Sequence, residues 1–132
     1  MILADTSAWV EYLRATGSTA DRRVSDLIEG DGPLTVTEPV VMEVLAGARD
    51  DSREWELRRL LARFPLLRFD PVIDFDAATR IYRSCRRNGV TPRGMVDCMI
   101  ASVAARHDAT LLAVDVDLLR IADVVGIAID EG

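Results

Sequence analysis

The chain has 132 residues, of which 49% are hydrophobic, and this fits one globular domain with its own core rather than a disordered chain. All 16 basic residues are arginine and 22 residues are acidic, so the net charge of −6 argues against unspecific binding of nucleic acid over the whole surface. No apolar run approaches the roughly 20 residues that span a bilayer, and the N-terminus lacks the pattern of a signal peptide. We therefore expect a cytoplasmic protein that does not associate with membranes.

Short apolar stretches alternate with helical patterns along the chain. In the first half we expect, in chain order, a buried strand at 2–5, a helix from Thr6 or Ser7 to Arg14, a second helix around 20–28, a strand at 34–36, a helix with Pro39 in its first turn, and a helix that starts at 50–52 and ends before Pro65. In the second half we expect a strand at 66–69, a helix that Asp74 caps and Asn88-Gly89 end, a buried helix from about Arg93 to Arg106, a strand at 110–114, a short helix at 117–123 and a last strand at 126–129.

Short apolar strands separated by helices indicate an α/β fold with a central parallel sheet and helices on both of its faces. The sequence contains no internal repeat, linker or low-complexity tract, so we expect a single domain over residues 1–132. In such folds ligands bind at the carboxyl ends of the strands. This rule selects Asp5, at the end of the first strand, and Asp115, directly after the strand at 110–114.

Four carboxylates stand in apolar sequence surroundings and are the candidate catalytic and metal-binding residues: Asp5, Glu43, Asp97 and Asp115. Converging carboxylates raise one another's pKa unless a cation neutralises them. Carboxylate oxygens suit Mg²⁺ or Mn²⁺, and such ions can activate water and stabilise the leaving oxygen of a phosphodiester. Because the chain has one histidine, His107, it cannot hold a histidine-rich metal site.

Each acid also has a structural alternative. Asp5 could cap the first helix, and Glu43 could pair with an arginine at the helix surface. Asp97 could be an acid favoured by the dipole at a helix N-terminus, and Asp115 could be a turn residue. For Asp117 we favour the role of helix N-cap, and we keep metal ligation as the alternative. The four acids together carry more weight than any one of them.

Four stretches of the sequence carry these acids: Asp5-Thr6-Ser7-Ala8-Trp9, residues 38–47 with Glu43, residues 97–101, and residues 111–118 with Asp115 and Asp117. In this order and at this spacing they resemble the motifs of the PIN-domain ribonucleases, and most closely the VapC toxins of bacterial toxin–antitoxin pairs. The resemblance covers essentially the whole chain. The fourth stretch departs from the common pattern at Val114 and Leu118, where family members often have a basic or polar residue and a phenylalanine.

The resemblance implies a PIN-like fold and a Mg²⁺-dependent or Mn²⁺-dependent endoribonuclease that cleaves structured RNA, such as loops of tRNA or ribosomal RNA, and so inhibits translation. It implies metal ligation by Asp5, Glu43, Asp97 and Asp115, with a hydroxyl of Thr6 or Ser7 near the metal or the phosphate. It also implies a homodimer and a VapB-like antitoxin, through which alone operator DNA would be bound.

Positive charge is concentrated between Asp76 and Asp97, where five arginines and no acid occur: Arg80, Arg83, Arg86, Arg87 and Arg93. They are candidates for contacts to the RNA backbone, because a guanidinium can bind a phosphate through two hydrogen bonds. Arg93 is the first candidate, since it lies four residues before Asp97. The alternative is a solvated helix face.

Three other functions compete with the toxin. A phosphatase with Asp5 as nucleophile would resemble enzymes with Asp-x-Asp after the first strand, and here Ser7 takes the second position. A PIN module that only binds RNA or protein would be favoured by loss of an acid, but all four are present. A free-standing RNA-processing nuclease differs by gene context, because only the toxin would have a neighbouring reading frame for a small DNA-binding protein.

Overall fold

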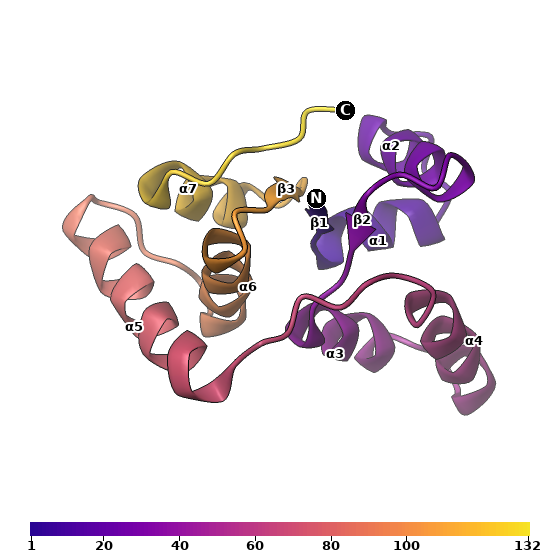
Figure 1. The fold of residues 1–132 in the computed structure, drawn as a ribbon, viewed down its shortest axis with the longest axis horizontal. Helices are drawn as coiled ribbons and strands as arrows, with labels where there is room; N and C mark the ends of the chain where they lie inside the picture. The colour runs from indigo at the N-terminus through magenta and orange to yellow at the C-terminus, as the bar shows by residue number, and fades with distance from the viewer.

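Three short parallel strands form the centre of the computed structural model, which describes residues 1–132 (Figure 1). They are β1 (Ile2–Ala4), β2 (Leu34–Thr35) and β3 (Thr110–Leu112), in the order β2-β1-β3. Ile2 pairs with both Leu34 and Thr110 across the two ladders. Every residue of β1 is buried, as its apolar sequence predicts for the central strand of a covered parallel sheet.

Seven helices surround this sheet: α1 (Thr6–Leu13), α2 (Thr19–Glu29), α3 (Glu38–Ala46), α4 (Asp51–Leu61), α5 (Pro71–Arg87), α6 (Met95–Arg106) and α7 (Val116–Val125). Helix α1 packs against α2 and α3, and α6 packs against α5 and α7. Figure 1 shows these two groups on opposite sides of the strands. The prediction of a parallel sheet with helices on both faces is confirmed.

The apolar faces of the helices and strands meet in one core. Its largest fully buried side chains include Trp9, Leu3, Ile100 and Leu111. At roughly 25 cal/mol per Å² of apolar surface removed from water, this burial is the main favourable contribution to folding. No helix is both long enough and apolar enough to cross a membrane.

The predicted ends of several elements differ from the structure. Strand β3 stops at Leu112, because the backbone N–H of Val114 turns to the Ser7 hydroxyl (3.0 Å) instead of continuing the ladder. Residues 66–69 and 126–129 do not form strands, since each contributes one isolated bridge, Leu66 to Val36 and Ile129 to Leu111. Helix α6 begins at Met95 rather than Arg93.

Helix α7 begins at Val116, so its N-cap position is Asp115, and the prediction of Asp117 as N-cap is wrong. Asp117 lies in the first turn, where its buried carboxylate accepts a hydrogen bond from the backbone N–H of Arg93 (3.0 Å). The acid therefore ties the loop before α6 to α7. The helix ends at Gly126, whose φ of +86° is favoured by glycine.

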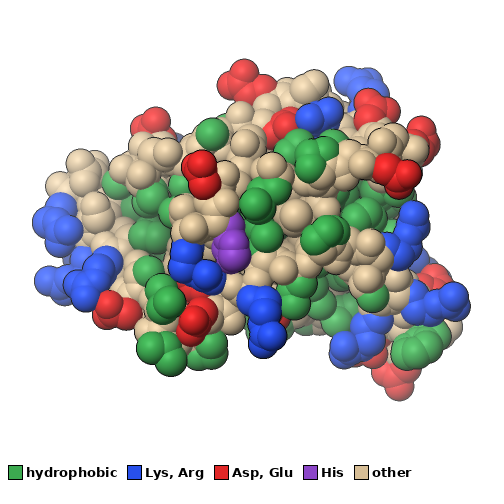
Figure 2. Space-filling view, in the orientation of Figure 1, with side chains coloured by type: hydrophobic (Ala, Val, Ile, Leu, Met, Phe, Trp, Pro, Cys, Tyr) green, Lys and Arg blue, Asp and Glu red, His purple; other side chains and the backbone are tan.

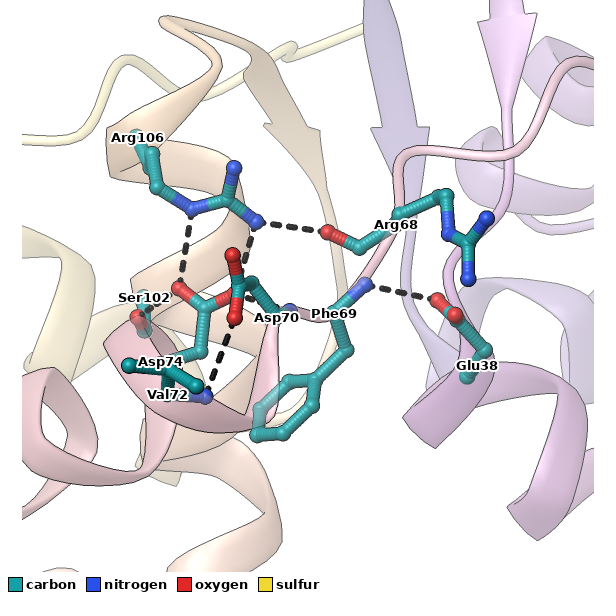
Figure 3. A network of polar contacts seen from close by, with 8 residues as sticks. All are labelled: Glu38, Arg68, Phe69, Asp70, Val72, Asp74, Ser102 and Arg106. Carbon is teal, nitrogen blue, oxygen red and sulfur yellow. Dashed lines mark hydrogen bonds and ion pairs between the residues drawn. The ribbon is translucent and has the colours of Figure 1, made fainter.

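The prediction that Asp74 caps the fifth helix is also wrong. Asp70 caps α5 instead, accepting a hydrogen bond from the backbone N–H of Val72 (2.9 Å), and Pro71 occupies the first turn. Asp74 points inward, where Arg106 donates to both of its oxygens (3.1 and 2.6 Å) and Ser102 donates to one (2.6 Å) (Figure 3). This buried contact fastens the start of α5 to the end of α6.

Candidate active site

The four acids predicted from the sequence line one cavity of about 620 Å³. Asp5 follows β1 and Asp115 follows β3, so both lie at the carboxyl ends of neighbouring parallel strands. Glu43 comes from α3 and Asp97 from the first turn of α6. Thr6, Ser7, Arg93 and Gly94 complete the lining, whereas Asp117 is absent from it. We call this space the acidic cavity.

Asp5 has both of the roles considered for it. Its carboxylate caps α1 by accepting a hydrogen bond from the backbone N–H of Ala8 (3.1 Å), and the same oxygen accepts one from the Ser7 hydroxyl (2.7 Å). The side chain is nonetheless at the wall of the acidic cavity. Capping therefore fixes the position of the acid without removing it from the site.

The Ser7 hydroxyl joins the first acidic stretch to the fourth. While it donates to Asp5, its oxygen accepts hydrogen bonds from the backbone N–H groups of Val114 (3.0 Å) and Asp115 (3.2 Å). The carboxyl ends of β1 and β3 are thereby held together at the wall of the cavity. The sequence identified Ser7 as a candidate near the metal or phosphate but gave no sign of this bridging contact.

Thr6 and Arg93 each engage one of the remaining acids. The Thr6 hydroxyl donates to Glu43 (2.6 Å), and Glu43 takes part in none of the ion pairs of the chain, so the surface ion pair considered for it is not formed. The Arg93 guanidinium donates to Asp115 (3.0 Å) from a side chain that is 76% exposed. The carboxylate of Asp97 makes no hydrogen bond, which leaves it the least constrained of the four acids.

The acidic cavity is short of positive charge. Burial is the main cause that raises the pKa of Asp5 to about 6, with a smaller contribution from the charge of Asp115, although hydrogen bonds from Ser7 and Ala8 oppose it. Burial also raises the pKa of Asp97 to about 7, and the charges of Asp115 and Glu43 add to this effect. Asp5 and Asp97 thus hold protons at a higher pH than ordinary carboxylic acids do, and a bound cation could replace these protons.

Oxygen donors of this kind fit a hard divalent cation such as Mg²⁺. As the side chains stand, however, no three His, Cys, Asp or Glu side chains are arranged to hold one metal ion. Thr6, Ser7 and Arg93 each hold one oxygen of a carboxylate in a hydrogen bond. A cation that used the Oδ1 atom of Asp115 would compete with the guanidinium of Arg93.

The five arginines that the sequence suggests for contacts to RNA fall into three groups. Arg93 lines the acidic cavity, whereas Arg80 pairs with Asp76 (2.8 Å) on the surface of α5. The other three, Arg83, Arg86 and Arg87, line a separate cavity. Sequence reasoning missed Gly94, which lines the acidic cavity without a side chain of its own.

Comparison with known proteins identifies relatives of the chain in sequence and in structure. Residues 2–124 match the family model of the PIN domain. Over 123 residues, which cover 92% of each chain, the sequence is 48% identical to Ribonuclease VapC11 of Mycobacterium tuberculosis. Among solved structures, VapBC2 from Rickettsia felis, bound to a DNA fragment from its promoter, matches with a TM-score of 0.75 and 16% identity over 98% of each chain.

A second solved structure, the sarcin–ricin loop cleaving toxin VapC20 of Mycobacterium tuberculosis, matches with a TM-score of 0.64 and 17% identity, over 90% of this chain and 93% of that one. At these identities the two structures are evidence for the fold alone. The family model and VapC11 extend the likeness to the sequence. The chain therefore belongs to the PIN-domain family and, within it, to the VapC ribonucleases.

Proposed function

We propose that this protein is a metal-dependent endoribonuclease that acts as the toxin of a toxin–antitoxin pair. The observation that carries the proposal is the convergence of Asp5, Glu43, Asp97 and Asp115 on one cavity, with the pKa of Asp5 raised to about 6 and that of Asp97 to about 7. Asp97 has neither an arginine nor a hydrogen-bond donor as partner, unlike the structural acid Asp74, which Arg106 and Ser102 satisfy. Membership of the VapC ribonucleases supports the same reaction.

Mg²⁺, with Mn²⁺ as the alternative, would be held by Asp5, Asp97 and Asp115, with Glu43 completing the set directly or through water. When bound, such an ion supplies an activated water and stabilises the oxygen that leaves phosphorus. Ser7 holds Asp5 and the start of α7 together through its hydrogen bonds, and Thr6 orients Glu43. Arg93, once released from Asp115, is placed to bind a phosphate of the RNA beside the acids.

The substrate we propose is structured RNA, such as a loop of tRNA or ribosomal RNA, whose cleavage would inhibit translation in the cytoplasm. Loops suit an open cavity, because their bases are already unstacked from a helix. The likeness to VapBC2 supports a VapB-like antitoxin as partner, which would also provide the contact to operator DNA. We further propose a homodimer, on the ground of the family resemblance alone.

The proposal is tested by incubating the purified protein with total RNA in Mg²⁺, in Mn²⁺ and in EDTA, followed by mapping of new RNA ends. Asp5→Asn and Asp97→Asn should abolish cleavage while the proteins stay folded. Glu56→Gln, which alters an exposed acid of α4, is the matched control and should cleave as the wild type does. Cuts that need metal and vanish in both site variants would support the carboxylate mechanism.

Two results would count against it. If folded protein free of antitoxin leaves all RNA intact at every metal concentration, the chain is a binding module rather than a nuclease. If cleavage persists in both Asp5→Asn and Asp97→Asn, the reaction takes place elsewhere in the molecule.

A further inference from the structure

A second cavity, of about 480 Å³, lies between α5 and the start of α6. It is lined by Thr79, Tyr82, Arg83, Arg86, Arg87 and Met95. The five residues from α5 follow the spacing i, i+3, i+4, i+7 and i+8, so they share one face of the helix. We call this space the arginine cavity.

The arginines of this cavity lack the partners that other arginines of the chain have. Arg80, on the same helix, pairs with Asp76, and Arg106 pairs with Asp74. None of the ion pairs of the chain includes Arg83, Arg86 or Arg87. Figure 2 shows basic side chains gathered at the edge of the molecule where α5 lies in Figure 1. In a chain of net charge −6, such a concentration of unpaired cations favours an anionic ligand.

The cavity also offers an aromatic and apolar wall. The side chain of Tyr82 is half-buried, and its ring packs against no other aromatic ring. Met95, the first residue of α6, is 43% exposed although it is apolar. An aromatic ring next to guanidinium groups is the combination that binds single-stranded nucleic acid, because bases stack on the ring while phosphates bind the cations.

The two cavities lie on either side of the N-terminal end of α6. Arg93 and Gly94 line the acidic cavity and the next residue, Met95, lines the arginine cavity. Met95 and Asp97 lie about 200° apart around the helix, so the cavities flank the same helix end on opposite sides. Gly94 has no side chain to block the way between them, and the helix has no side-chain cap over its first N–H groups. A strand of RNA can therefore cross from one cavity to the other over backbone that attracts phosphate.

We propose that the arginine cavity binds one nucleotide of single-stranded RNA adjacent to the nucleotides at the acidic cavity. Its base packs on Tyr82 and Met95, and its phosphate groups bind Arg83, Arg86 and Arg87. The inference rests on the proposed ribonuclease function, and it assigns the cavity to positioning of the substrate rather than to the reaction. The arrangement would fix which phosphate reaches the carboxylates.

Binding and cleavage can be separated by working in the Asp97→Asn background, with fluorescent single-stranded RNA followed by anisotropy over a range of salt concentrations. Replacing the three arginines with glutamine should reduce the salt slope of log Kd by about 1.4, because loss of contacts to the two phosphates that flank one nucleotide removes about 0.7 each on a single strand. Arg80→Gln, on the same helix but paired with Asp76, is the control and should leave the slope unchanged.

Tyr82→Leu should weaken RNA binding about tenfold without a change in the salt slope, since a stacked base contributes roughly 1–3 kcal/mol. Tyr82→Phe should bind as tightly as the parent, because stacking needs the ring and not the hydroxyl. The affinity for an RNA that lacks the base of the bound nucleotide should not change with Tyr82→Leu.

Unchanged affinity and slope in both the arginine and the Tyr82→Leu variants would overturn the inference. Conversion of a dimer to a monomer by the arginine changes, with RNA affinity unchanged, would also overturn it and would identify this face as a contact between two copies. Either result differs from failure of the proposed function, which is read from cleavage by the wild type and not from binding.

Discussion

Replacing Asp97 with asparagine should stabilise the metal-free protein, and should do so more at pH 8 than at pH 5. In the folded chain, burial and the charges of Asp115 and Glu43 raise the pKa of Asp97 from 3.8 to about 7. The folded state thus holds this proton more tightly than the unfolded state does. The associated stability is present below pH 3.8 and is lost as the pH rises through about 7, because the folded chain must then bear an unfavourable charge. Asparagine carries no such charge.

The size of the effect follows from the same shift. Between pH 5 and pH 7 the loss is at most about 2.7 kcal/mol, from about 1.36 kcal/mol for each pH unit. Because Asp97 is partly exposed, water screens its charge, and we expect about 1 kcal/mol. With an unfolding entropy of about 2.1 cal/mol/K for each of 132 residues, this corresponds to a difference of about 4 °C in Tm.

The measurement is thermal unfolding of the wild type and the variant in EDTA at both pH values. Asp76→Asn, which changes an exposed acid of α5, should show no gain that depends on pH in this way. A lower Tm for Asp97→Asn at both pH values, or an equal gain at both, would refute the argument that the acidic cavity destabilises the metal-free fold.

Three further outcomes are expected. Mg²⁺ should raise the Tm of the wild type more at pH 8 than at pH 6, since the cation competes with protons for the carboxylates. A thermal-shift series that starts from EDTA-treated protein measures this. Arg93→Ala should bind Mg²⁺ more tightly by calorimetry but RNA more weakly by anisotropy, because its guanidinium occupies Asp115 (3.0 Å) in the metal-free protein. Asp74→Ala should lower the free energy of unfolding in urea by about 3 kcal/mol, as it breaks a buried ion pair and leaves Arg106 without its partner. Burial alone would raise the pKa of Asp74, but the hydrogen bonds from Arg106 and Ser102 outweigh it and lower this pKa. The stability of the wild type should therefore fall as the pH drops below 3.8, and this fall should be smaller in Asp74→Ala.

The sequence predicts the convergence of two of the four acids, because for them it follows from topology. Asp5 and Asp115 each come directly after a short apolar strand, and the carboxyl ends of parallel strands share one edge of the sheet. Glu43 and Asp97 lie in helices, where nothing in their local pattern says which neighbour they face. Their place in the cavity was expected from the family motifs rather than from periodicity.

What the sequence could not supply depends on contacts between distant residues. Asp70 and Asp74 are four residues apart, and both precede a helical pattern, so each is a reasonable N-cap by local criteria. The choice is made by Arg106, more than thirty residues later, which binds Asp74 within the core (Figure 3). The apolar alternation at 126–129 similarly predicts a strand, but only Ile129 forms a bridge with β3.

Arg93 and the unpaired arginines of α5 differ in how the negative charge of the acidic cavity affects them. A cavity lined by four carboxylates carries negative charge and repels RNA phosphates. Arg93 lowers this repulsion by pairing with Asp115, yet by the same contact it competes with the metal. If metal displaces Arg93 and RNA then binds the freed guanidinium, each ligand favours the other by the same factor, as linkage requires. The unpaired arginines of α5 stand outside this competition, so they can attract RNA whether or not the acidic cavity holds a cation.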